Sequence, residues 1–302
     1  MAGPEGAQAP ADVPGACYLC GGREHAIVSD RLRYGSTRKV WRCSSCGLVF
    51  LHPGMTPAEE REFYEREYGE IFSAEKGTTP AQLFEARLPD ARMYRDWVTE
   101  DLGPGDRCLE IGCASGYFLA TIRDRVASVA GIETHQLLRE FCTGSGIPVF
   151  GSIDEVGEEA FTRVFLFFLL EHVGDPAAFL RGLRRVLAPG GKIFIVVPNV
   201  DDALLSLYNI PAFRSFYYTP AHQFYYSPPT LGALFRMAGF PRFTIGPKQR
   251  YDLSNHIWWM TAGRPGGTGK FNHVFTPDLN REYAAALEDR FLCDTLFARI
   301  EG

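Results

Sequence analysis

From Arg107 onward, short apolar segments alternate with segments of helical periodicity. Strands are predicted in the first part of this region at 108–112, 128–133, 148–150, 164–170 and 192–197. A helix over 230–238 follows, and two final strands at 242–246 and 256–261 are predicted to form a hairpin. Regular alternation of strand and helix is typical of a parallel sheet that helices cover on both faces. The pattern therefore predicts an α/β fold with a Rossmann-like, seven-stranded mixed sheet.

Four cysteines near the N-terminus form two C-x2-C pairs, Cys17 with Cys20 and Cys43 with Cys46. Two such pairs about 20 residues apart are typical of a zinc site in which each pair lies on a tight turn. Four thiolates complete a tetrahedral coordination shell, so we expect a structural Zn²⁺ and no catalytic metal. The alternative interpretation is two coincidental pairs of buried thiols.

Changes in pattern divide the chain into five parts. Each boundary lies where apolar periodicity begins, ends or changes its spacing. In chain order we expect a disordered Pro/Gly/Ala-rich tail (1–16), a small zinc-binding module (17–53), a helical linker or lid (54–104), the alternating core (105–262, with an α-helical lid inserted at 201–229) and a C-terminal extension (263–302).

The charge distribution argues against a surface that binds a polyanion. The formal net charge is −5, from 31 Lys and Arg against 36 Asp and Glu. Residues 17–53 hold six bases and two acids, which gives +4 there and −9 on the remainder. A protein that grips nucleic acid over most of its surface is expected to be basic. A local basic patch on the zinc-binding module is compatible with this distribution.

No segment has the length of a membrane span. The longest unbroken apolar run is 164–170, whereas a bilayer crossing needs about 20 residues. Residues 1–16 contain acids and no base, which is unlike a secretory signal. The cytoplasm, which keeps thiols reduced, is therefore the expected location, with no membrane partner.

The turn after the first strand of the core runs from Gly112 to Gly116. Ligands of open α/β sheets bind outside the carboxyl ends of the strands where the winding reverses, so we expect the binding site here. Gly112 permits a sharp turn, Ala114 keeps the loop low, and Gly116 lets the next helix begin close to a ligand. A dinucleotide site would need glycine at position 117, which is Tyr117. The loop therefore favours a ligand with one ribose and no phosphate.

Two carboxylates flank this turn. Glu133 ends the second strand, where a carboxylate can bind both hydroxyls of a ribose. Glu110 lies in the first strand, where an acid suits a cationic ligand. A nucleoside with a positive charge is S-adenosylmethionine (SAM), so we expect SAM as the cofactor. Ser152, just beyond the third strand, completes the predicted SAM-binding residues.

Four motifs follow one another through the core: LEIGCASGYFL, GIE, LLEHVGDPAAFLRGLRRVLAPGGKIFIVVPN and HQFYYSPPTLGALFRMAGF. In this order they resemble the motifs of class I SAM-dependent methyltransferases. The cysteine pairs and the segment 222–227 resemble more narrowly a branch that includes zinc-containing C-methyltransferases of nucleotide-linked deoxysugars. The chain departs from that branch at Ala221, where glutamate is usual, and at Thr162 and Arg163, where an acidic residue usually opens the fourth strand. The segment after Ala262 is also too short for the further C-terminal domain of that branch.

The resemblance implies four catalytic candidates. His222 lies in the stretch that passes over the methyl group in this fold, and a neutral imidazole suits a general base. Tyr225 could share the acceptor with it, and His172 could orient the acceptor. Tyr64 stands where this branch places an active-site tyrosine. Each has a packing alternative: a lid histidine, a core histidine, or tyrosines packing along a helix.

The expected function is SAM-dependent methylation of a small molecule, with assistance from a base. The acceptor would be a nucleotide-linked sugar or a secondary-metabolite scaffold of natural-product biosynthesis, methylated on carbon, nitrogen or oxygen. One alternative is an rRNA or tRNA methyltransferase that binds its RNA through the basic zinc-binding module. The other is a scaffold without catalysis, against which Gly112, Gly116 and Glu133 argue.

Overall fold

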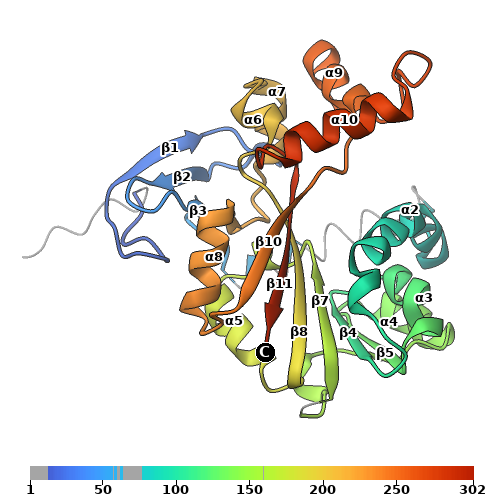
Figure 1. The fold of residues 1–302 in the computed structure, drawn as a ribbon. Helices are drawn as coiled ribbons and strands as arrows, with labels where there is room; N and C mark the ends of the chain where they lie inside the picture. The colour runs from blue at the N-terminus through green and yellow to red at the C-terminus, as the bar shows by residue number, and fades with distance from the viewer. Residues whose placement is uncertain (1–12, 57, 60–61, 64–76, 159) are drawn as a thin grey trace, which may run out of the picture.

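The structure is a computed structural model that describes residues 13–56, 58–59, 62–63, 77–158 and 160–302. A seven-stranded sheet forms its centre (Figure 1). In spatial order the strands are β10 (Phe243–Lys248), β11 (Thr295–Glu301), β8 (Leu187–Pro198), β7 (Phe161–Phe167), β4 (Arg107–Ile111), β5 (Ser128–Ile132) and β6 (Val149–Phe150). Strand β11 runs antiparallel to both neighbours, and the other pairings are parallel. The predicted Rossmann-like mixed sheet is confirmed.

Alternation along β7 divides the hydrophobic core between the two faces of this sheet. Val164 and Leu166 belong to one buried cluster, and Phe165 and Phe167 pack in the other. In the second cluster the ring of Phe167 stacks on Tyr94, with centroids 4.8 Å apart. The first face is covered by α5 (Pro176–Leu183) and α8 (Pro228–Met237), and the second by α2 (Pro80–Val98), α3 (Tyr117–Ile122) and α4 (Gln136–Gly144).

Polar side chains fix where these helices begin. Thr79 precedes α2; its hydroxyl accepts a hydrogen bond from the Gln82 amide, and its own amide donates to Oε1 of Gln82. Asp175 precedes α5 and accepts from the Ala178 amide at 3.0 Å. Both helices then start with proline, whose missing N–H costs nothing in the first turn.

The last strand of the sheet differs from the prediction. Residues 256–261 belong to helix α9 (Leu253–Ala262), and the seventh strand is β11, within the predicted C-terminal extension. Helix α9 starts at Asp252, whose carboxylate accepts from the Asn255 amide at 2.8 Å. It ends at Gly263, where φ is +62°. These start and stop signals outweigh the aromatic run that indicated a strand.

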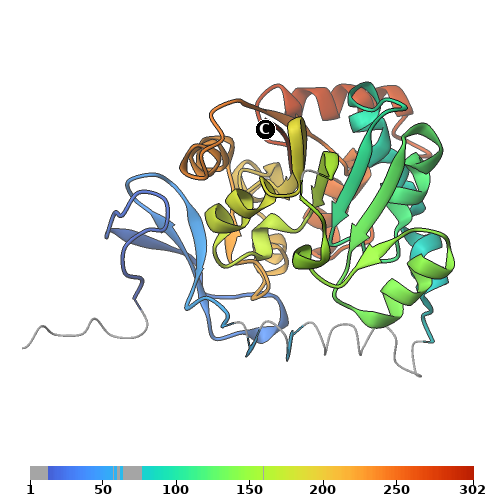
Figure 2. The same cartoon turned by 90° about the horizontal axis from the view of Figure 1, so that it is seen from below.

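A second sheet joins the N-terminal module to a segment far along the chain. Its four antiparallel strands are β1 (His25–Ser29), β2 (Lys39–Cys43), β3 (Val49–His52) and β9 (Phe224–Tyr225). Val49 pairs with Tyr225 and Phe50 with Phe224. Figure 2 shows the module, in blue, beside the central sheet. Backbone hydrogen bonds of the sheet therefore join the module to the segment that carries Tyr225.

The helices beyond the carboxyl ends of the parallel strands come from two distant parts of the chain (Figure 1). Trp259, which was predicted to lie in a strand, packs in helical conformation against Phe213 and Phe216, with ring centroids 5.0 Å away in both cases. The hydroxyls of Tyr208 and Tyr283 lie 3.0 Å apart. The helices are α6 (Ala203–Ser206), α7 (Pro211–Tyr217), α9 and α10 (Pro277–Glu288).

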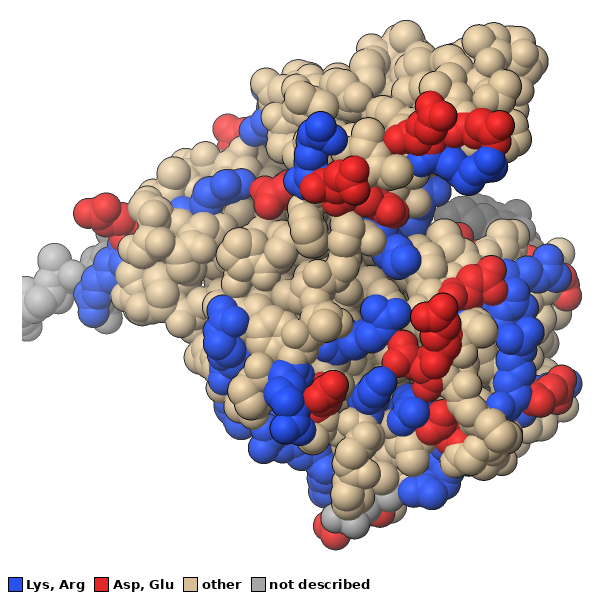
Figure 3. All heavy atoms as spheres, in the orientation of Figure 1, with Lys and Arg blue, Asp and Glu red and all other residues tan. Residues whose placement is uncertain are grey.

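The surface charge and the helix lengths bear on what the protein can bind. On the face drawn in Figure 3, basic and acidic side chains are interspersed and form no continuous basic stripe. Within the described ranges, no helix combines the length and the apolar character that a membrane crossing requires.

Short 3-10 turns complete the fold. They are η1 (Arg33–Gly35), η2 (Thr99–Asp101), η3 (Arg123–Arg125), η4 (Ile153–Glu155) and η5 (Leu170–His172).

Candidate functional site

The turn between β4 and α3 has the backbone conformation that its glycines predict. Gly112 and Gly116 have φ of +76° and +73°, and Ala114 also lies in the left-handed region, with φ of +46°. A Cβ at position 116 would lie 3.1 Å from both Cys142 Sγ and Ile147 Cδ1. Gly116 therefore allows the turn to approach the α4 segment, which is a different reason from the expected proximity to a ligand.

Glu133 follows β5, and backbone amides hold its carboxylate in place. One oxygen accepts from the Ala114 amide at 3.0 Å and the other from the His135 amide at 2.8 Å. The side chain is buried. Each carboxylate oxygen has a further lone pair, so the group can still accept from two ribose hydroxyls. The same bonds tie the end of β5 to the glycine turn.

Glu110 lies in β4 beneath this turn and is 1% exposed. Its Oε2 has no hydrogen-bond partner. Burial raises the pKa of Glu110 well above its ordinary value, and Cys142 and Glu133 raise it further. A buried carboxylate oxygen without a partner is costly, and a cationic ligand would relieve that cost.

These residues fit a cationic nucleoside such as SAM. Strands β4 and β5 are paired in register, so the turn and Glu133 lie side by side at their carboxyl ends. The orphaned oxygen of Glu110 is a suitable partner for positive charge. Ser152 is exposed after β6, with its Oγ 3.5 Å from Glu155 Oε1. When it is bound, SAM supplies the electrophilic methyl group.

His172 and His222 meet edge to face beyond the end of β7, with ring centroids 4.6 Å apart. Nδ1 of His172 lies 3.1 Å from the carbonyl oxygen of Ala221, whereas the buried Nδ1 of His222 has no hydrogen-bond partner. Burial lowers the pKa of His172 to about 4. Burial, with His172 and Arg33, lowers the pKa of His222 well below its usual value. Both rings are therefore neutral at pH 7.

The hydroxyl of Tyr225 is engaged by the backbone of Thr219. Its hydroxyl donates to the Thr219 carbonyl at 3.0 Å and accepts from the Thr219 amide at 2.8 Å. The side chain is buried, and its ring lies 5.4 Å from that of His222. Tyr225 therefore orders the loop that carries His222, and its hydroxyl is engaged. Tyr64 lies outside the described residues.

Glu171, the neighbour of His172, is also part of this group. It is 1% exposed, and neither of its carboxylate oxygens has a hydrogen-bond partner. Burial raises the pKa of Glu171 to about 8. One oxygen of Glu171 and one nitrogen each of His172 and His222 lie within 4.8 Å of one another.

Arg250 is a cation of this region that the sequence analysis did not single out. Its guanidinium carbon lies 4.4 Å from the centre of the Phe168 ring, and its Nε is 3.0 Å from Asp294 Oδ2. The attraction of Arg250 lowers the pKa of Glu171 in part, against the larger effect of burial. No motif could have identified the pair, because 44 residues separate Arg250 from Asp294.

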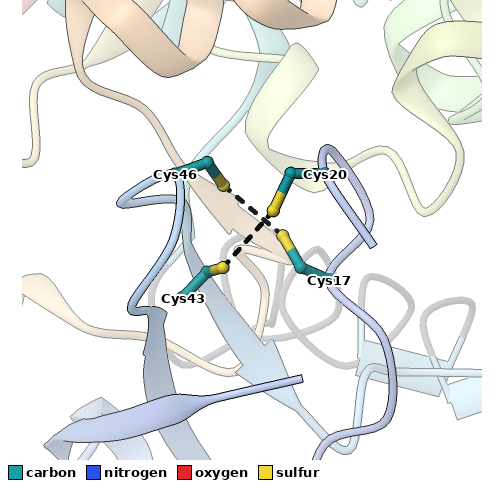
Figure 4. A group of neighbouring side chains, drawn as sticks. All are labelled: Cys17, Cys20, Cys43 and Cys46. Atoms are coloured by element: carbon teal, nitrogen blue, oxygen red, sulfur yellow. Dashed lines mark hydrogen bonds between the residues drawn. The ribbon is translucent and has the colours of Figure 1, made fainter. Parts of the chain in front are cut away.

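The four N-terminal cysteines converge as their spacing predicts (Figure 4). The sulfur atoms of Cys17 and Cys46 lie 3.6 Å apart, as do those of Cys20 and Cys43. All four sulfur atoms lie within 4.8 Å of one another. The two turns therefore point four potential thiolate ligands at a common centre.

The sheet topology and the chemistry of the glycine turn together define a class I SAM-dependent methyltransferase. Residues 83–241, more than half of the chain, match the family described as methyltransferase domain, so the chain belongs to that family.

Several curated relatives are named ubiquinone biosynthesis O-methyltransferase. The protein from Pseudomonas aeruginosa (strain LESB58) is 31% identical over 183 residues, which cover 54% of this chain and 79% of the relative. The one from Xanthomonas axonopodis pv. citri is 30% identical over 196 residues, and the match covers 59% of this chain and 79% of the relative. A solved structure of a SAM-dependent methyltransferase from Archaeoglobus fulgidus also matches. The match covers 80% of this chain and 100% of the other chain, with 16% sequence identity and a TM-score of 0.48.

Proposed function

We propose that this SAM-dependent methyltransferase acts on a small molecule, a nucleotide-linked sugar or a secondary-metabolite scaffold, which binds beneath the lid. The pairing of β3 with β9 is the observation that carries this proposal, because it bonds the N-terminal module to the strand of Tyr225. The basic module then serves as a wall of the acceptor site near His222. The relatives named O-methyltransferases of ubiquinone biosynthesis also support a small acceptor.

Methylation of rRNA or tRNA has weaker support. The module has a local excess of basic residues, but basic and acidic side chains are interspersed on the face in Figure 3. The module also uses β3 to pair with β9, so that edge is not free for nucleic acid. A nucleic-acid enzyme would be expected to show binding that weakens steeply with salt.

In the proposed mechanism the chain aligns the acceptor and removes its proton. Methyl transfer is an in-line displacement, so alignment provides much of the rate. Neutral His222 accepts the proton of the acceptor through Nε2, and His172 lies beside it to orient the acceptor. Tyr225 keeps the loop of His222 in place through Thr219. Helices α6 and α7, in the predicted lid segment 201–229, exclude water from the bound acceptor.

We further propose that Cys17, Cys20, Cys43 and Cys46 bind a structural Zn²⁺. Zinc–sulfur bonds of about 2.3 Å in a tetrahedron place sulfur atoms about 3.8 Å apart, close to the 3.6 Å found in both pairs. Protein purified without oxygen should contain about one zinc per chain, and Cys43→Ser should lose it together with thermal stability. Absence of zinc, with four freely titratable thiols, would contradict this assignment.

Turnover of isotopically labelled SAM tests the acceptor class. The panel contains nucleotide-linked keto and amino sugars, phenolic scaffolds, and unmodified tRNA and rRNA, with products identified by mass. The proposal expects methylation within the first two groups. Methylation of RNA alone would overturn it.

A further inference from the structure

In the group formed by Glu171, His172 and His222, three buried polar atoms have no hydrogen-bond partner. They are both carboxylate oxygens of Glu171 and Nδ1 of His222. A buried polar atom that makes no hydrogen bond costs about 1–3 kcal/mol. Native structures contain few such atoms, and each one calls for an explanation.

The backbone holds these groups against one another. The Gln223 amide donates to the Glu171 carbonyl at 2.8 Å. On the neighbouring residue, the His172 ring meets the Ala221 carbonyl at 3.1 Å. Contacts from residues 171 and 172 therefore brace His222 on both sides. One carboxylate oxygen of Glu171 and one ring nitrogen of His222 lie within 4.8 Å of each other.

We propose that Glu171 is the positioning residue of His222. Its carboxylate accepts the Nδ1–H of His222 and so leaves the Nε2 lone pair free for the proton of the acceptor. One bridging water closes the gap between the carboxylate and the ring, or the two side chains move closer together when the acceptor binds. This inference rests on the proposed function, in which His222 is the base.

The chemistry of the pair explains why His222 needs such a partner. Burial leaves the neutral ring weakly basic. A carboxylate on Nδ1 fixes the tautomer and stabilises the imidazolium that forms. In the reaction the bond from the acceptor atom to hydrogen breaks and its electron pair bonds to the methyl carbon, while the carbon–sulfur bond breaks. The proton moves to Nε2 of His222, and Glu171 remains ionised as its counter-ion.

Protonation of Glu171 reverses this arrangement. A carboxylic acid would donate to Nδ1 of His222 and force the ring hydrogen onto Nε2, where it blocks catalysis. Burial raises the pKa of Glu171 to about 8, so kcat should rise with pH up to about 8 and then level. Among the residues that the structure describes, the other titratable or charged groups that interact with Glu171 are Arg250, His172, Tyr217, Tyr225 and Tyr226.

Kinetics of Glu171→Gln test the inference. The variant keeps the shape of the side chain but cannot ionise, so at pH 9 we expect kcat to fall ~10²–10³-fold with KM unchanged. The rise of kcat through pH 8 should disappear. The matched control is Asp202→Asn, because Asp202 is also buried with a pKa raised to about 8, and asparagine can still cap α6. The control should keep the rise.

Nitrogen NMR of the His222 ring gives a readout that needs no acceptor. Wild-type protein at pH 9 should show the Nδ1–H tautomer, and Glu171→Gln should lose it. Combining Glu171→Gln with His222→Ala should add no further loss of kcat beyond His222→Ala alone. An unchanged tautomer, or a second metal ion per chain that Glu171→Gln removes, would overturn the inference. Failure to find an acceptor would count against the proposed function and leave the NMR result standing.

Discussion

Glu133 in the proposed cofactor half of this site and Glu171 in the proposed acceptor half are held in opposite ways. In the cofactor half, two backbone amides bind Glu133. In the acceptor half, Glu171 is buried with no hydrogen-bond partner at either oxygen. The first half is built by the turn after β4 and the end of β5, which these bonds hold together in advance. The second is assembled from side chains of distant segments, so its polar groups await a partner.

Removal of His222 should have the largest effect. We expect His222→Ala to lower kcat by ~10²–10⁴-fold, as is typical when a general base is lost. Steady-state rates with the identified acceptor measure this. His273→Ala is the control, because it removes an exposed histidine. Near-normal turnover of His222→Ala would move the base to His172.

Glu133→Ala probes the cofactor half. Two charge-assisted hydrogen bonds to a ribose would be lost, so SAM affinity should fall by about 2–4 kcal/mol. Calorimetric titration with SAM measures the change. Glu140→Ala removes an exposed acid from α4 and should leave the affinity as it is. Unchanged binding by Glu133→Ala would show that Glu133 only braces the turn.

Glu171→Gln should make the folded protein more stable at high pH. Burial raises the pKa of Glu171 to about 8, from an ordinary value of 4.5. Between these values the unfolded chain releases a proton that the folded chain keeps, so stability falls as pH rises and is constant above about 8. Glutamine removes this penalty, which predicts a gain in the free energy of unfolding of ~2–4 kcal/mol at pH 8 and little at pH 4.

Denaturant unfolding at the two pH values measures that gain. Glu140→Gln, on the surface of α4, should show no difference between them. Equal stability of wild type and Glu171→Gln at pH 8 would show that burial does not raise the pKa of Glu171.

Tyr225→Phe should have the smallest effect. It removes both hydrogen bonds to Thr219 and keeps the ring, so stability should fall by about 1–2 kcal/mol. The kcat should change only a few-fold, through a looser loop around His222. Thermal unfolding and steady-state rates measure the two quantities. A loss of kcat as large as that of His222→Ala would return Tyr225 to the catalytic group.

Local signals explain which features the sequence could predict. The strand and turn around Gly112 and the cysteine pairs were predictable, because each depends on residues close together in the chain. Strand β11 was missed because the aromatic run 256–261 resembled a strand, while Asp252 and Gly263 marked a helix. The hydrogen bonds of Tyr225 depend on the conformation of one loop, and the ion pair of Arg250 depends on tertiary packing; no sequence motif encodes either.

The affinity of His222→Ala for SAM tests most directly whether the two halves are separate. If the cofactor half is preformed by the turn and Glu133, calorimetry should give a dissociation constant for SAM within about twofold of wild type, even though turnover is lost. A weakening of tenfold or more would contradict the account, because His222 would then belong to the cofactor site and could not be assigned to the acceptor alone.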